Sequence, residues 1–191
     1  MLRLMQTKTK PLTLYFNQTV WRSVAAIVFF AALTALTARI TIYLPFTPVP
    51  ITLQTLAVVL SGLVLGARGG ALTQISYLGL IAVGLPFDAN AMGPAAFVGP
   101  TAGYLIGFVP AAFAAGWLAE RYAVNSWWGN FVAAIAGMLV IYLVGASWLA
   151  VWLGSWQKAW IGGVAPFIVI DMGKAAIAAG VAESGKRLMN R

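Results

Sequence analysis

Six apolar stretches of near membrane-spanning length follow one another along this chain. They cover residues 23–44, 52–66, 71–86, 101–119, 130–153 and 166–182. A transmembrane helix needs about 20 largely apolar residues, with a range of about 17–25. The second and third stretches are short, and only a tight basic turn at residues 67–70 separates them. The pattern therefore predicts an all-α integral membrane protein, a bundle of six transmembrane helices.

The overall composition excludes the common alternatives. Apolar residues make up 61% of the 191 residues and charged residues 8%, against about 45–50% and 25% in soluble domains. Too little polar surface remains to cover a soluble globule, and the 8 Trp, 6 Tyr and 10 Phe are unlike a disordered chain. We expect one membrane domain over residues 1–191, with a basic cytoplasmic segment at 1–22 and a six-helix substrate-binding bundle at 23–187.

The basic residues indicate the orientation of this bundle. With six spans, Arg39 and Lys158 face one side, Lys174 lies inside a span, and nine basic residues share the side of both termini. Those nine are Arg3, Lys8, Lys10, Arg22, Arg68, Arg121, Lys186, Arg187 and Arg191. Because cytoplasmic loops are enriched in Lys and Arg, both termini are predicted to be cytoplasmic in a multi-pass protein of the cytoplasmic (inner) membrane. The net charge of +8 then reflects topology and contact with membrane lipid, not nucleic-acid binding.

Several chemically active residue types are missing. The chain has no Cys and no His, and its only acids are Asp88, Glu120, Asp171 and Glu183. It therefore lacks imidazole and thiolate metal ligands and the commonest general base. We expect no enzyme activity, no metal site and no cofactor.

Asp171 and Lys174 lie inside the last apolar stretch. Each charge costs about 2.5–3.5 kcal/mol at the centre of a span on insertion scales, and residues three apart share one helical face. The pair is either an ion pair that only joins helices or a polar ligand site, and intramembrane charges usually mark a substrate path. At a rise of about 1.5 Å per residue, Asp171 lies roughly 8 Å in from the external start of this span. A ligand site here would open to the outside.

Other segments allow two readings. Ala31 and Ala35 form a small-xxx-small pattern that lets another helix approach closely, so they serve either packing within the bundle or docking of a partner subunit. The irregular segments 45–52 and 87–99, the second of which contains Asn90, are either lids over the site or simple connections.

Four motifs resemble the signature of one family. They are PVPITLQTLAVVLSGLVLGARGG at residues 48–70, YLGLIAVGLP at 77–86, GPTAGYLIGF at 99–108 and DMGK at 171–174. The family is BioY, the biotin-specific substrate-binding component (S-component) of energy-coupling factor (ECF) vitamin transporters. The resemblance runs in order from about residue 24 to residue 187.

This resemblance implies high-affinity binding of biotin, the transported ligand, from the external side and its delivery across the membrane. In many relatives it also implies partnership with a transmembrane coupling subunit and two cytoplasmic ATPase subunits. In this family the positions of Asp171 and Lys174 contact the ligand, as does a polar loop residue that we place at Asn90. The ureido ring of biotin offers N–H donors and a carbonyl acceptor to such a pair. Apolar walls for its tail are expected from Phe87, Tyr104 and Tyr142.

Two alternatives remain open from the residues. One is an ion-coupled secondary transporter of biotin or another small vitamin, with Asp171 as a proton or ion site. The other is the same fold with a different vitamin as ligand, because a carboxylate and an ammonium do not by themselves select biotin.

Overall fold

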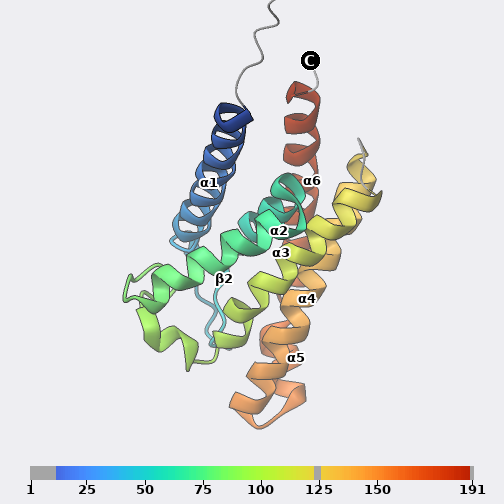
Figure 1. The fold of residues 1–191 in the computed structure, drawn as a ribbon. Helices are drawn as coiled ribbons and strands as arrows, with labels where there is room; N and C mark the ends of the chain where they lie inside the picture. Colours follow the sequence, from blue (N-terminus) through green and yellow to red (C-terminus); the bar gives the residue numbers. More distant parts are fainter. Residues whose placement is uncertain (1–11, 123–125, 190–191) are drawn as a thin grey trace, which may run out of the picture.

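The protein folds as a bundle of helices in a computed structural model that describes residues 12–122 and 126–189 (Figure 1). Its elements are α1 (Leu12–Thr37), β1 (Thr41–Ile42), β2 (Ile51–Thr52), α2 (Gln54–Ala82), the 3₁₀ helix η1 (Gly93–Phe97), α3 (Ala102–Tyr122), α4 (Trp127–Leu153), α5 (Trp156–Gly163) and α6 (Ile168–Met189). The start of α1 and the end of α6 lie at one end of the bundle, and α5 lies at the other.

The helices have the length and composition of membrane spans. Within the described residues, four are long and apolar enough to cross a membrane, namely Val20–Thr37 of α1, α2, α3 and α4. A fifth candidate is α5 together with α6, with a bend of 50° between them. The prediction of a helical, multi-pass membrane protein is confirmed.

α2 is broken at Gly66, where the backbone has φ +76° and ψ −179°, a conformation that residues with a Cβ avoid. In a straight helix Gly62 and Gly70 would be about 12 Å apart along the axis. Here a Cβ built on Gly70 would lie 2.7 Å from the Cα of Gly62, so the chain folds back on itself. The predicted stretches 52–66 and 71–86 correspond to the two halves of α2, and the turn expected at 67–70 is instead helical.

Glu120 of α3 holds this break in place. Its Oε1 accepts a hydrogen bond from the backbone N–H of Ala67 at 3.0 Å, at the start of the second half of α2. A carboxylate is favourable there because the N-terminal N–H groups of a helix lack partners and carry partial positive charge. A Cβ at Gly66 would lie 2.0 Å from the same Oε1, so this contact requires glycine.

The first predicted span, 23–44, was too long at its C-terminal end. α1 ends at Thr37, and the chain then forms β1, whose Thr41 and Ile42 pair with Thr52 and Ile51 of β2. The β-branched residues Ile and Thr are enriched in strands, whereas the apolar residues among 40–44 made this segment look like part of the span. The predicted segment 1–22 is helical from Leu12 onward.

The structure describes only some of the basic residues that were predicted to lie on the cytoplasmic side. Arg3, Lys8, Lys10 and Arg191 lie outside the described residues.

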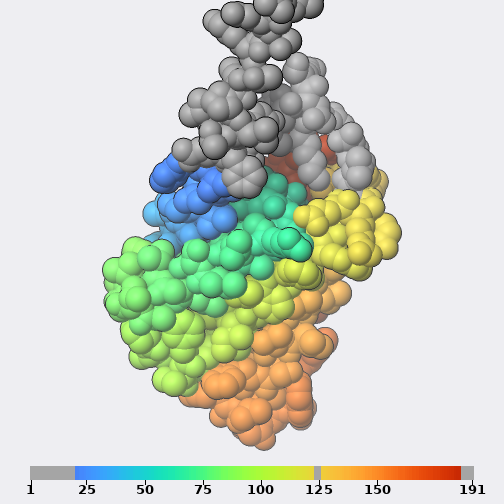
Figure 2. Space-filling view, in the orientation of Figure 1, coloured from blue at the N-terminus to red at the C-terminus, as the bar shows by residue number. Residues whose placement is uncertain are grey.

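α5 was not expected from the sequence, because it lies between the apolar stretches 130–153 and 166–182. Gly154 ends α4 in a left-handed conformation, φ +65°. Ser155 then caps α5 by accepting a hydrogen bond from the N–H of Lys158 at 3.3 Å. Figure 2 shows α5 and the end of α4, in orange, projecting as one end of the molecule.

Candidate ligand-binding site

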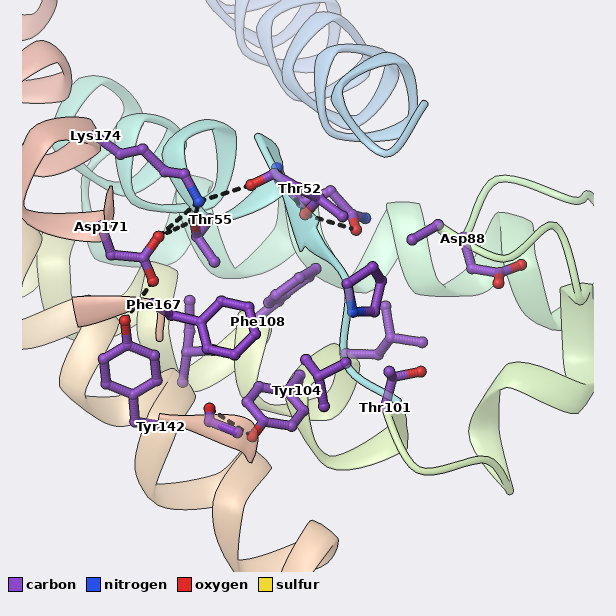
Figure 3. A pocket seen from close by; sticks show the side chains of 17 residues that line it. Thr52, Thr55, Asp88, Thr101, Tyr104, Phe108, Tyr142, Phe167, Asp171 and Lys174 are labelled. Carbon is purple, nitrogen blue, oxygen red and sulfur yellow. Dashed lines mark hydrogen bonds and ion pairs between the residues drawn. The ribbon is translucent and has the colours of Figure 1, made fainter. Parts of the chain in front are cut away.

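A cavity of about 60 Å³ lies inside the bundle, where β2 and the start of α2 meet α3, α4 and α6 (Figure 3). Its lining comes from the start of α2 and the segment before it (Val49, Pro50, Thr52, Gln54, Thr55), the loop after α2 (Asp88, Ala89), the start of α3 and the residue before it (Thr101, Tyr104, Leu105, Phe108), α4 (Ile141, Tyr142) and the α5–α6 region (Gly163, Phe167, Asp171, Lys174). Mostly apolar walls with a few polar groups are typical of small-molecule sites.

The Lys174 ammonium uses all of its hydrogen-bond donors at this cavity. Its Nζ lies 2.6 Å from Oδ1 of Asp171, and it also donates to the Thr52 carbonyl at 2.7 Å and to Oγ1 of Thr55 at 3.0 Å. An ammonium has three donors, so all three are used. Lys174 is only 4% exposed and Asp171 3%, and the pair therefore joins α6 to the start of α2 as well as facing the cavity.

The Asp171 carboxylate accepts hydrogen bonds from residues of three helices. Besides Lys174, Oγ1 of Thr55 donates to Oδ1 at 3.2 Å, and the hydroxyl of Tyr142 donates to Oδ2 at 2.5 Å. A carboxylate has about four acceptor positions, so these three hydrogen bonds leave room for another donor. Figure 3 shows the carboxylate between the Lys174 ammonium and the Tyr142 ring.

Tyr104 forms the opposite part of the wall. Its hydroxyl donates to the carbonyl of Gly163 at 2.8 Å. A Cβ on Gly145 would lie 2.3 Å from Cδ1 of its ring, so glycine in α4 makes the space that the ring fills. The structure thus brings together four predicted residues, Asp171, Lys174, Tyr104 and Tyr142.

The two other predicted residues lie beside the cavity. Neither Asn90 nor Phe87 lines it, whereas their neighbours Asp88 and Ala89 do. Asp88 is 2% exposed, and its carboxylate accepts the backbone N–H of Asn90 at 3.1 Å and of Gly93 at 2.8 Å. Sequence reasoning missed Asp88, although its place among only four acids was a signal.

A buried hydrogen-bond chain connects the cavity wall to this loop. Nε2 of Gln54, which lines the cavity, donates to the hydroxyl of Tyr77 at 2.6 Å. That hydroxyl donates to the carbonyl of Phe87 at 3.0 Å. Gln54 and Tyr77 lie in the sequence motifs at residues 48–70 and 77–86. The sequence did not predict their contact, because it forms only when the two halves of α2 fold back on each other.

The same loop is also held from its outer side. Arg39 donates to the carbonyl of Pro86, and the hydroxyl of Tyr43 donates to the carbonyl of Ala89 at 3.1 Å. The segment after α1 therefore fastens the loop after α2 beside the cavity.

Replacing Tyr77 by phenylalanine is expected to loosen this loop. The change leaves the Phe87 carbonyl and the Gln54 amide without their buried partner, at a cost of about 1–3 kcal/mol. Hydrogen exchange of residues 86–93, followed by mass spectrometry, should become faster. The matched control is Tyr43→Phe, which removes an exposed hydroxyl from the same loop and should have a smaller effect because water can replace it. Equal exchange in both variants would show that the buried chain does not hold the loop.

Ala31 and Ala35 face the interior of the protein. They are 3% and 8% exposed and border a groove between α1 and the second half of α2, where Ser76, Leu80 and Phe87 also lie. This burial agrees with packing within the bundle, and docking of a partner subunit stays a prediction.

Comparisons with known proteins point to one family. The model of the BioY family matches residues 5–191. A protein of Pyrococcus horikoshii named "Probable biotin transporter BioY" is 43% identical over 163 residues, which are 85% of this chain and 94% of that protein. A protein of Rhizobium etli named "Biotin transporter BioY" is 42% identical over 160 residues, 79% of this chain and 85% of the other.

A comparison of the fold with solved structures agrees with the family match. A crystal structure of the S-component for biotin from an ECF-type ABC transporter superposes with a TM-score of 0.82, at 26% sequence identity, and covers 92% of this chain and 94% of that one. The match of the family model over almost the whole sequence, together with relatives above 40% identity, settles the family. This chain belongs to the BioY family.

Proposed function

We propose that this chain is the biotin-binding S-component of an ECF-type transporter, which captures biotin at the external face and delivers it across the membrane without chemical change. The observation that carries this proposal is the buried Asp171–Lys174 pair, which lines an internal cavity in a chain of the BioY family. The names of the relatives and of the solved S-component support biotin as the ligand.

The chemistry of biotin suits this cavity. The ureido ring carries N–H donors and a carbonyl acceptor. The Asp171 carboxylate accepts an N–H of the ring, and Lys174 donates to the carbonyl in exchange for one of its present partners. Tyr104, Phe108 and Phe167 supply apolar walls for the rest of the molecule. Asn90 and Phe87 belong to the loop that we propose covers the ligand.

We further propose six membrane spans with both termini in the cytoplasm. The spans are α1, the two halves of α2, α3, α4 and α6. This arrangement is supported by the fold-back at Gly66, by the start of α1 and the end of α6 at the same end of the bundle (Figure 1), and by the excess of basic residues on that side. The cytoplasmic membrane follows as the location.

The proposed partners are the ECF coupling subunit and its two ATPase subunits, with membrane lipid covering the remaining surface. α1 offers an apolar outer face, since Val28, Phe29 and Leu36 are each more than 60% exposed. In this proposal Ala31 and Ala35 contribute to docking by setting how closely α1 packs on α2.

Calorimetric titration of the detergent-purified chain with biotin, and separately with other vitamins, tests the function. Tight binding of biotin alone is expected. Selective binding of another vitamin would keep the fold and overturn the ligand. No binding, by a chain that still unfolds cooperatively on heating, would overturn the proposal. Proton-driven uptake into liposomes that contain this chain alone would favour the ion-coupled alternative.

A further inference from the structure

A second space adjoins the cavity. It is a groove of about 590 Å³ between α4, α5 and α6, with apolar side chains that include Leu139, Leu143 and Trp160. Tyr142 and Asp171 line both this groove and the 60 Å³ cavity. The hydrogen bond from the Tyr142 hydroxyl to the Asp171 carboxylate, 2.5 Å long, is therefore part of the partition between the two spaces.

The cavity is narrow as it stands. Sites for small molecules typically have about 300–1,000 Å³, against about 60 Å³ here, so we expect a wall to move when a ligand enters. Several wall residues are at most 6% exposed and sit in the close-packed core, among them Leu105, Phe108, Ile141 and Phe167. Tyr142 is only half-buried, and the groove lies on its other side.

The Tyr142 hydroxyl also offers Asp171 the same kind of donor as the proposed ligand. Lys174 and Thr55 donate to Oδ1, whereas Tyr142 is the donor at Oδ2 among the hydrogen bonds described for this carboxylate. A ureido N–H approaching Oδ2 would compete with the hydroxyl for the same oxygen.

We propose that Tyr142 is a displaceable gate of the binding site. The ligand N–H replaces the hydroxyl on Oδ2 of Asp171, the phenol ring turns toward the groove, and the cavity gains the space that the ring occupied. Tyr142 thus limits how fast the site accepts its ligand. This inference rests on biotin as the ligand, and its tests compare variants of a chain whose own biotin binding is measured first.

Tyr142→Phe removes the hydroxyl and keeps the ring. Biotin association, followed by stopped-flow tryptophan fluorescence, should become about three- to tenfold faster, the size of effect that one net hydrogen bond gives. The matched control is Tyr104→Phe, which changes the other tyrosine of the same cavity, bonded to Gly163 instead of Asp171, and should not accelerate association. Slower or unchanged association in Tyr142→Phe, or a loss of affinity as large as in Asp171→Asn, would show that Tyr142 is a fixed support of Asp171.

Filling the groove tests the same gate from its other side. Leu139, on α4 one turn before Tyr142, lines the groove but not the cavity and is 59% exposed. Leu139→Trp should obstruct the ring and slow biotin association about tenfold, a typical size for overpacking. Leu72→Trp on α2, where the leucine is 50% exposed and lines neither space, is the control and should leave the rate as it is. Equal rates in the two variants would overturn the gate. If the unmodified chain does not bind biotin, the proposed function fails instead.

Discussion

Replacing Asp171 by asparagine is expected to weaken biotin binding by about 1.5–3 kcal/mol, roughly 10- to 100-fold in Kd. Asparagine keeps the size of the side chain but loses the charge that strengthens a hydrogen bond from a ligand N–H. Its amide N–H₂ also turns one acceptor into a donor beside the Lys174 ammonium, which lies 2.6 Å from Oδ1 in the present structure. Calorimetric titration of the variant with biotin measures the loss.

Stability must be measured alongside affinity, because Asp171→Asn leaves Lys174 as an unpaired buried charge. Removing one partner of a buried pair typically costs about 3–5 kcal/mol of folding free energy, so the unfolding temperature in detergent should fall as well. The double variant Asp171→Asn with Lys174→Gln removes both charges and is expected to recover stability without recovering binding. Recovery of both would mean that the pair only joins helices, and unchanged affinity in Asp171→Asn would place the ligand elsewhere.

Gly116→Ala is expected to cause a large loss of stability. A Cβ at Gly116 would lie 2.4 Å from the backbone N of Ala67 and 2.4 Å from the backbone C of Gly66. Neither atom is the end of a flexible side chain, so α3 must move away from the break in α2, at a cost of about 1–3 kcal/mol. The Ala67–Glu120 contact at 3.0 Å would be disturbed by the same movement. Thermal unfolding in detergent measures the loss.

Gly79→Ala is the matched control for this prediction. Gly79 lies in the second half of α2, and a Cβ there meets nothing within 4 Å. The same chemical change should stabilise the helix by up to about 1 kcal/mol, since alanine has the higher helix propensity. A Gly116→Ala chain as stable as Gly79→Ala would show that the two helices have room to separate.

The sequence alone determined the class of the protein and the location of its charged pair. Too few polar residues are present to cover the long apolar stretches in water, and in lipid the backbone polar groups of these stretches must be satisfied within helices. Asp171 and Lys174 stood out for a local reason, since charges within a span are costly and the two residues are three positions apart on one helix face. The boundaries of α3 and α4 also followed closely from the apolar pattern.

Only the tertiary structure decided which groups complete the site. Tyr142 and Asp171 are 29 residues apart, and Gln54 reaches Tyr77 only because α2 folds back at Gly66. The sequence placed Asn90 at the ligand, whereas the fold puts Asp88 and Ala89 in the wall. The apolar pattern of the sequence indicates which residues avoid water. It does not indicate which other helix they contact, because apolar side chains gain similar free energy from any apolar neighbour. Which polar groups meet across those faces depends on how closely the helices approach, and glycines such as Gly66, Gly116 and Gly145 set that distance.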